Sequence, residues 1–146
     1  MTKILIKKKS NLITMPKYET LGSSGMDLAA FINDKIIIKP QEKIIIPTGL
    51  SIAIPEGFEI QIRPRSGLAA KHSLTVLNTP GTIDSDFRGE IKVILINLGV
   101  ENYTIANGER IAQIVLCPVS KIEFEEVSNL SATKRGQGGF GSTGTK

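Results

Sequence analysis

The amino-acid sequence predicts an all-β domain built as a jelly-roll-like sandwich, and three observations support this. The 146-residue chain contains 22 isoleucines and 8 alanines, and β-branched side chains favour strands because they lose rotamer freedom in a helical turn. Turn signals containing Gly, Pro or Asn recur about every eight to ten residues, as in sandwiches and barrels. The segments between these turns show the apolar alternation of strands.

The expected elements follow from this pattern in chain order. Alternating apolar residues predict half-buried strands over 50–54 and 58–62. The segments 91–97 (IKVILIN) and 111–117 (IAQIVLC) are more continuously apolar, which predicts strands covered on both faces, inside the sandwich or at a subunit contact. The stretch 66–72 (SGLAAKH) has helical composition and predicts one short helix. The turns are expected at Pro47-Thr48-Gly49, Pro55-Glu56-Gly57, Asn78-Thr79-Pro80-Gly81, Arg88-Gly89, Asn97-Leu98-Gly99 and Asn107-Gly108.

The C-terminal residues have a different composition from the rest. From Thr133 onward the one large apolar residue is Phe140, and five glycines lie within 136–144. Such a segment cannot form a core. We therefore expect a β domain over residues 1–132 and a flexible glycine-rich arm over residues 133–146.

The net charge of +4 is concentrated at the two ends of the chain. Residues 1–9 and 134–146 together carry +7, whereas residues 10–133 carry −3. A basic face for nucleic acid is therefore absent from the body, and neither stable nucleic-acid binding nor membrane association is expected, because no apolar run approaches the roughly 20 residues that span a bilayer. The single Cys117 and the lack of a secretory signal indicate the cytoplasm.

The glycine-rich arm contains a G-x-G-x-x-G pattern over 136–141, but it is not a dinucleotide-binding motif, because no helix can follow it. The arm nevertheless offers anion-binding groups: Arg135, the hydroxyls of Ser142 and Thr143, and glycine N–H groups. Phe140 is suited to anchoring on another surface or stacking on a base. The alternative is an unstructured tail.

Two further segments carry charges suited to phosphate chemistry. Asp84 and Asp86 lie in a glycine-bounded turn within 78–90, and the segment 63–67 (RPRSG) places two arginines just before the expected helix. For the two acids taken alone, the simpler explanation is that they are solvated turn carboxylates. For the segment 63–67 taken alone, the simpler explanation is a surface ion-pair cluster. Together with Asp27 and the arm, however, they favour a polyphosphate ligand bound with a metal ion.

Five segments, taken in order, resemble the motifs of the trimeric dUTPase family. They are GMDLAA (25–30), RPRSGLAAK (63–71), LNTPGTIDSDFRGEI (77–91), GERIAQIVL (108–116) and RGQGGFGSTG (135–144). The resemblance implies a jelly roll, a homotrimer with active sites shared between subunits, and a C-terminal arm that closes over the nucleotide of another subunit. It also implies Mg²⁺-assisted attack of water on the α-phosphate of dUTP, giving dUMP and pyrophosphate, which limits uracil incorporation into DNA and supplies dUMP for thymidylate synthesis.

The resemblance also implies roles for individual residues. Asp84 is the carboxylate that orients and activates the attacking water. The expected base and sugar contacts are Asn78, Gly81, Thr82, Ile83, Phe87 and Phe140. The expected phosphate contacts are Arg65, Ser66, Gly67, Gln113, Arg135, Gly141, Ser142 and Thr143. Asp27 and Gln113 are expected to reach the waters of the metal.

Two positions depart from the family pattern. Phe87 stands where many members have Tyr, which keeps the flat ring but removes a hydroxyl, and Gln137 stands where a smaller residue is common. His72 has no partner at a catalytic spacing, so it is interpreted as a surface or structural residue. Cys117 is interpreted as a core residue, and Lys7–Lys9 as a solvated strand end.

Three other functions agree less well with the sequence. The related dCTP deaminases have a glutamate for proton transfer in the strand after the hairpin, whereas the segment 91–97 here has no acid. A nucleic-acid-binding β module would need aromatic platforms between basic residues, and this chain has few aromatic residues. A purely structural jelly roll leaves the Asp84 turn and Phe140 unexplained.

Overall fold

The computed structural model describes residues 2–139, and almost all of its regular structure is β, as predicted. The described elements are β1 (Leu5–Lys8), β2 (Met26–Ala29), β3 (Ile36–Ile38), β4 (Lys43–Pro47), β5 (Leu50–Ala53), β6 (Phe58–Arg63), α1 (Ser66–His72), β7 (Leu74–Val76), β8 (Gly81–Ile83), β9 (Lys92–Asn97), β10 (Tyr103–Ile105) and β11 (Arg110–Pro118). One apolar cluster connects these strands, in a jelly-roll-like arrangement.

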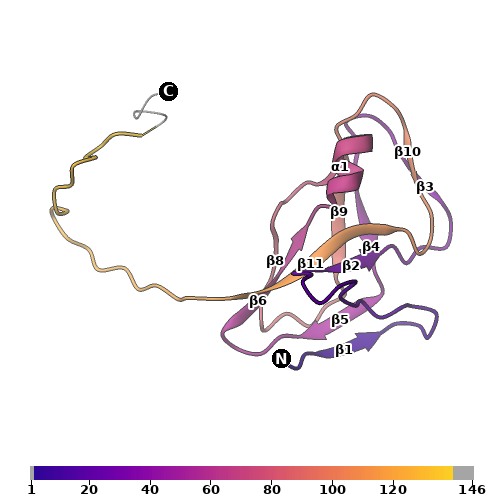
Figure 1. Cartoon of the computed structure of the whole chain (residues 1–146), viewed down its shortest axis with the longest axis horizontal. Coiled ribbons are helices and arrows are strands. Elements are labelled where there is room, and N and C mark those ends of the chain that lie inside the picture. Colours follow the sequence, from indigo (N-terminus) through magenta and orange to yellow (C-terminus); the bar gives the residue numbers. More distant parts are fainter. Residues whose placement is uncertain (1, 140–146) are drawn as a thin grey trace.

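The strands pair in four small antiparallel sheets (Figure 1). The largest has the order β2-β11-β6-β8, and a second has the order β4-β9-β7. Two further pairs, β1-β5 and β10-β3, complete the body. The nine-residue β11 is the longest strand, and it pairs with β2 on one side and β6 on the other.

The alternation in β5 and β6 places the apolar side chains in the core, as predicted. In β6, Ile60 and Ile62 are each 3% exposed. Glu59 and Gln61 point to the opposite face, where Gln61 Nε2 donates a hydrogen bond to Glu59 Oε1 over 2.7 Å. The period of two residues in the sequence therefore identified the face of the strand that is buried.

The two continuously apolar segments behave differently from one another. In β11, the neighbours Ile114 and Val115 are both buried, so both faces of this strand are covered, as predicted; Gly25, just before β2, lies against Val115. An added Cβ on Gly25 would lie 3.2 Å from Val115 Cγ2. In β9, Val93 is buried but the outward Ile94 is half-buried. A subunit contact over β9 therefore stays a prediction.

Three of the expected turns contain a glycine in a backbone conformation that favours glycine, and these turns are confirmed. Gly49, Gly57 and Gly108 have φ values of 67°, 84° and 79°, in the left-handed region that other residues rarely adopt. At Gly49 space is also limiting, because an added Cβ would lie 2.3 Å from Ile13 Cδ1. Both constraints exclude a side chain at this turn.

The single expected helix is confirmed with its predicted bounds, Ser66–His72. Leu68 is its buried residue, and Ser73 ends it in the left-handed conformation with φ 53°. Within residues 2–139 no helix is long and apolar enough to cross a membrane.

The side chain of His72 packs against that of Tyr103, and this contact is structural. The two rings meet edge to face with centroids 4.9 Å apart, and the Tyr103 hydroxyl donates to Glu109 Oε1. Glu109 Oε2 also accepts from the Ala106 N–H over 3.0 Å, which closes the turn between β10 and β11. Burial, reinforced by the hydrogen bond and the charge of Glu109, raises the pKa of Tyr103 to about 12, so Tyr103 remains a hydrogen-bond donor at neutral pH.

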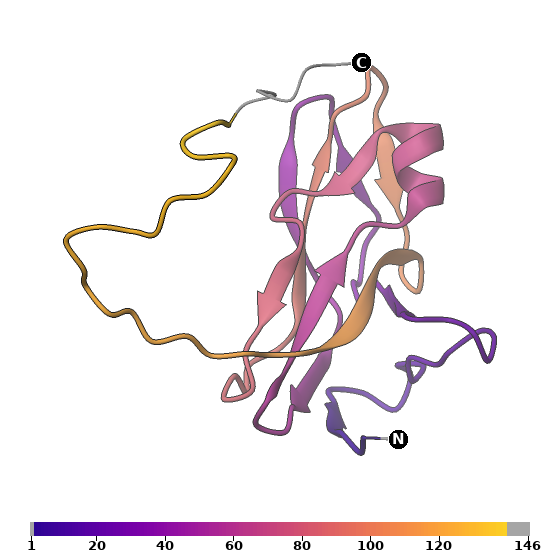
Figure 2. The ribbon, with the colours of Figure 1, turned by 60° about the vertical axis from the view of Figure 1, so that its left-hand side comes forward.

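After β11 the chain leaves the body. Residues 119–139 contain no helix or strand, and in Figure 1 they extend away from the sheets. Figure 2 shows that the same segment swings outward and then turns back toward the body. Five large apolar side chains on this segment are exposed, namely Val119, Ile122, Phe124, Val127 and Leu130. The division at residues 132 and 133 stays a prediction, and residues 140–146 lie outside the described part of the chain.

One buried polar side chain ties the end of β9 to β3 and to the loop between β9 and β10. Asn97 is fully buried, and its Nδ2 donates to the carbonyls of Ile38 (3.0 Å) and Glu101 (2.7 Å). Its Oδ1 accepts from the Gly99 N–H over 2.9 Å. All the polar atoms of this amide are therefore paired, as burial requires.

We predict that Asn97→Ala lowers the free energy of unfolding by about 2–4 kcal/mol, because buried backbone groups lose their partners and a cavity forms. The matched control is Asn102→Ala, which removes the same amide from an exposed position nearby and should change stability by less than about 0.5 kcal/mol. Urea unfolding of both variants at one protein concentration measures the difference. Equal stabilities would contradict the structural role of Asn97.

Candidate active site

The sheet β2-β11-β6 brings three separate motifs of the sequence together. In the strand register Gln113 of β11 lies opposite Asp27 of β2 on one side and Arg63 of β6 on the other. Chain segments more than 80 residues apart in sequence are therefore neighbours here. The short link after β6 then leads directly to Arg65 at the start of α1.

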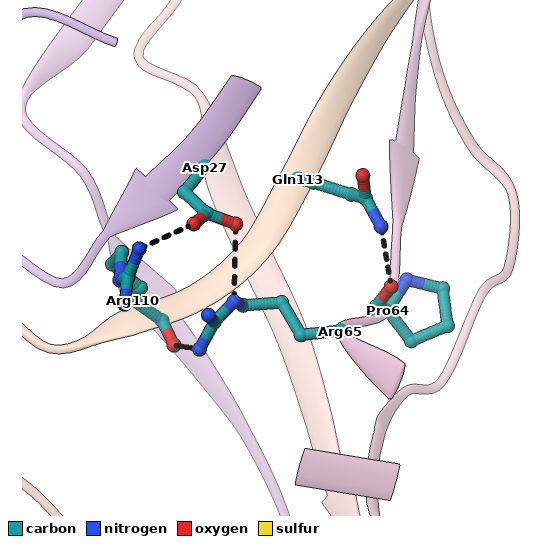
Figure 3. Close-up of polar contacts among 5 residues, drawn as sticks. All are labelled: Asp27, Pro64, Arg65, Arg110 and Gln113. Carbon is teal, nitrogen blue, oxygen red and sulfur yellow. Dashed lines mark hydrogen bonds and ion pairs between the residues drawn. The ribbon is translucent and has the colours of Figure 1, made fainter. Parts of the chain in front are cut away.

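Asp27 is the centre of an ion-pair cluster (Figure 3). Its Oδ1 accepts from Arg65 Nε and its Oδ2 from Arg110 Nη1, each over 3.0 Å. Arg65 Nη1 also donates to the Arg110 carbonyl over 3.1 Å. Because the carboxylate and Arg65 are only 23% and 27% exposed, these charge-assisted contacts fix the guanidinium firmly. Asp27 therefore positions a cation at the start of α1.

The two arginines of the RPRSG segment do not form one anion site. Arg63 turns away from Arg65 and donates through Nε and Nη2 to Gln61 Oε1, at 3.2 and 2.8 Å. Its Nη2 also lies 3.8 Å from Cys117 Sγ. Cys117 is half-buried, so its interpretation as a core residue is only partly right. Arg65 alone remains available beside α1.

Gln113 is held by close packing. Its Nε2 donates to the Pro64 carbonyl over 3.1 Å, as Figure 3 shows. An added Cβ on Gly25 would lie 2.6 Å from Gln113 Oε1 and 3.1 Å from the Ile114 carbonyl. Gly25 therefore leaves space for this amide and lets the backbone approach β11.

The residues around Asp27 do not form a metal cage by themselves. No cluster of three or more His, Cys, Asp or Glu side chains suited to a metal occurs within residues 2–139, and both Asp27 oxygens already accept from arginines. Gln113 Oε1 accepts no hydrogen bond from the described residues. Mg²⁺ retains several waters and takes oxygen ligands from substrate phosphates, so this sparse oxygen set fits a hydrated, phosphate-bound Mg²⁺.

The segment 78–90 forms a second group of candidate residues, and it is not a β-hairpin, because β9, the strand that follows, pairs with β4 and β7 in another sheet. β8 pairs with β6 only, and it is one of the two edge strands of its sheet in the described structure. Asn78 lies beside it, since an added Cβ on Gly81 would lie 3.2 Å from Asn78 Nδ2. Gly81, Thr82 and Ile83 therefore present one backbone edge next to an exposed amide.

The turn after β8 carries the candidate catalytic carboxylate. The Phe87 N–H donates to the Asp84 carbonyl over 3.2 Å, which closes the turn. Asp84 is exposed and lines a groove of about 660 Å³ together with Asp86. The Phe87 ring is 40% exposed. One short turn thus presents a free carboxylate and a flat apolar ring.

The predicted site residues fall into separate groups within one chain. Asp84 lines the groove of about 660 Å³, whereas Gln113 lines another of about 450 Å³ with Pro64 and Pro80. Arg135 bonds locally, through Nε to the Gly138 carbonyl over 2.7 Å, on the segment that leaves the body. The predicted contacts of Phe140, Gly141, Ser142 and Thr143 lie outside the described residues.

Sequence reasoning missed two residues that build this site. Arg110 contacts Asp27 from the far side, and Gly25 makes room for Gln113. The strand register that brings Arg110 to Asp27 also contains an irregularity between Arg110 and Ala112, which no local pattern reveals. Gly25 and Arg110 both lie within the five motifs that resemble the family, and this position in a motif is the sequence signal that indicates them.

Comparison with known proteins gives a consistent result. The dUTPase family model matches residues 11–144. A deoxyuridine 5'-triphosphate nucleotidohydrolase from Fusobacterium nucleatum subsp. nucleatum is 57% identical over 132 residues, which are 90% of each chain. One of the same name from Hydrogenobaculum sp. is 55% identical over 144 residues, which are 99% of each chain.

The fold of the chain is also similar to that of a solved dUTPase structure. The structure of the Staphylococcus bacteriophage 80alpha dUTPase with dUPNHPP superposes with a TM-score of 0.87 at 27% identity, and covers 99% of this chain and 100% of the phage chain. The sequence motifs, the family model and the fold therefore agree, and the chain belongs to the dUTPase family.

Proposed function

We propose that this protein hydrolyses dUTP to dUMP and pyrophosphate in the cytoplasm. The observation that carries the proposal is the turn after β8, where an exposed carboxylate, Asp84, and a partly exposed ring, Phe87, lie beside an open strand edge. One short segment of the chain, residues 78–90, thereby combines a base reader, a sugar surface and a proton acceptor. The nucleotide chemistry of the named relatives supports this assignment.

The open edge of β8 is suited to uracil. An edge strand presents unpaired backbone N–H and C=O groups, and uracil offers the matching set of two carbonyl acceptors and one N3–H donor. Asn78, whose amide both donates and accepts, lies next to Gly81. Gly81, Thr82 and Ile83 with Asn78 therefore form the proposed base reader, and Phe87 the proposed floor of the deoxyribose.

The phosphate end of the nucleotide is proposed to bind at the start of α1. Arg65 is oriented by Asp27, and Ser66 and Gly67 are exposed beside it. Gln113 and Asp27 are proposed to contact the waters of a phosphate-bound Mg²⁺, which would neutralise charge on the triphosphate. The proposed contacts of the arm are Arg135, Phe140, Gly141, Ser142 and Thr143.

The reaction needs a proton acceptor and charge stabilisation. Asp84 accepts a proton from water while the water oxygen bonds to the α-phosphorus, and the bond from this phosphorus to the bridging oxygen breaks, so pyrophosphate leaves. General-base assistance typically contributes about 10²–10⁴-fold. The remaining acceleration comes from alignment and from cationic donors such as Arg65 near the leaving oxygen.

We further propose a homotrimer whose sites combine residues of different subunits. The apolar side chains named above on the segment 119–130 are exposed in the single chain, and their burial against another subunit would favour assembly. Asp84 and Gln113 line different grooves, so neighbouring subunits are proposed to bring these groups around one nucleotide.

The dCTP deaminase alternative is disfavoured by the position of Glu90. This acid lies two residues before β9, and its Oε1 accepts a hydrogen bond from the Gly49 N–H over 2.9 Å. Its carboxylate is therefore half-buried and committed to a turn. The strand β9 itself carries no acid.

We predict a strong preference for dUTP over dTTP, dCTP and UTP. The C5 methyl of thymine would crowd the segment 78–90, the N4 donor of cytosine would face backbone donors, and the ribose 2'-OH would meet the Phe87 ring. Each mismatched buried polar group costs about 1–3 kcal/mol. The measurement is kcat/KM for all four triphosphates with Mg²⁺, following pyrophosphate and ammonia separately. Ammonia release from dCTP would indicate a deaminase, and equal rates on all four would refute the base reader.

We predict that Asp84→Asn lowers kcat by about 10²-fold or more with little change in nucleotide affinity, because the amide keeps the shape but accepts no proton. The matched control is Asp86→Asn, which neutralises a second exposed acid in the same groove. This control should retain nearly full kcat. If Asp84→Asn turns over at the wild-type rate, or if both variants lose activity equally, Asp84 is not the proton acceptor.

A further inference from the structure

The turn that carries Asp84 and Phe87 is held by its own residues. Arg88 Nη1 donates to the Ser85 carbonyl over 2.6 Å and to the Phe87 carbonyl over 2.8 Å. Together with the hydrogen bond from the Phe87 N–H to the Asp84 carbonyl, these contacts fix the backbone on both sides of the ring. The direction in which Phe87 leaves the chain is therefore set locally.

The ring itself lies on the backbone of Gly89. An added Cβ on Gly89 would lie 2.6 Å from Phe87 Cζ, 2.9 Å from Cε2 and 3.4 Å from Cε1. Two of these distances are shorter than carbon atoms tolerate, since their optimal separation is about 3.5–4.0 Å. The φ of Gly89 is not in the left-handed region, so the backbone conformation does not require glycine here. Glycine is required by the space that the Phe87 ring occupies.

We propose that Gly89 is a specificity-positioning residue, which sets the height of the Phe87 ring and thereby the selection of deoxyribose over ribose. The proposal rests on the function proposed above, in which the exposed face of Phe87 underlies the sugar. With hydrogen alone at position 89, the end of the ring lies close to the backbone of Gly89. Any side chain would push the ring toward the sugar or tilt it aside, and the fit that excludes a 2'-OH would be lost.

The test compares Gly89→Ala with wild type in the full-length protein. We expect the ratio of kcat/KM for dUTP to that for UTP to fall by about tenfold or more, the scale that small steric changes produce in a pocket. The loss should appear mainly in the dUTP value as a raised KM. The matched control is Gly22→Ala, where an added Cβ meets nothing within 4 Å, and its ratio should equal that of wild type.

A double-mutant cycle separates ring placement from a general structural effect. In a Phe87→Ala background no ring is left to displace, so adding Gly89→Ala should leave the dUTP to UTP ratio unchanged. An unaltered ratio in the single Gly89→Ala variant would overturn the proposal. So would an equal effect of Gly89→Ala with and without the ring.

Folding and the proposed function are checked in the same experiment. If Gly89→Ala does not fold, the variant that combines Phe87→Ala with Gly89→Ala decides between the two causes. Cooperative unfolding of this double variant near the wild-type temperature would support displacement of the ring as the cause. Failure of the double variant to fold would overturn the proposal. Wild-type protein that releases no pyrophosphate from dUTP would instead refute the proposed function. Failure of the inference about Gly89 is thus distinguishable from failure of the assigned reaction.

Discussion

The antiparallel pairing of β11 with β2 and β6 is the constraint on which the rest of the site depends. It places Gln113 opposite Asp27 and Arg63, and it brings Arg110 to the second oxygen of Asp27. A shift of one residue would turn every side chain of a strand to the other face. The buried residues on both faces of β11 prevent such a shift, because Ile114 and Val115 would each lose their packing.

The same sheet supports a second, structurally different half of the site. The Asp27 cluster is partly buried, and its ion pairs cross-link the strands β2 and β11 and the start of α1. The turn after β8 is exposed and held by Arg88, Gly89 and one turn hydrogen bond. The first arrangement is suited to fixed phosphates. The second leaves a carboxylate and a ring exposed, as the proposed contacts with water, base and sugar require.

Much of the fold followed from local chemistry, but the site followed only in part. Isoleucine alternation identified the buried face of β6, and the helix at Ser66–His72 appeared where composition indicated it. The separation of Arg63 from Arg65 could not be foreseen, because it depends on the neighbours Gln61 and Asp27. Gly89 read only as a turn residue, since its contact with Phe87 exists only in three dimensions.

The central claim is that one active site combines the Asp84 turn of one subunit with the arm of another. Its most direct test co-expresses two inactive, differently tagged chains, Asp84→Asn and a deletion of residues 134–146, and purifies oligomers that contain both. Either composition of a mixed trimer then holds one complete site, so about a third of wild-type activity should return. Mixed oligomers that stay inactive would show that each chain uses its own arm and would contradict the account.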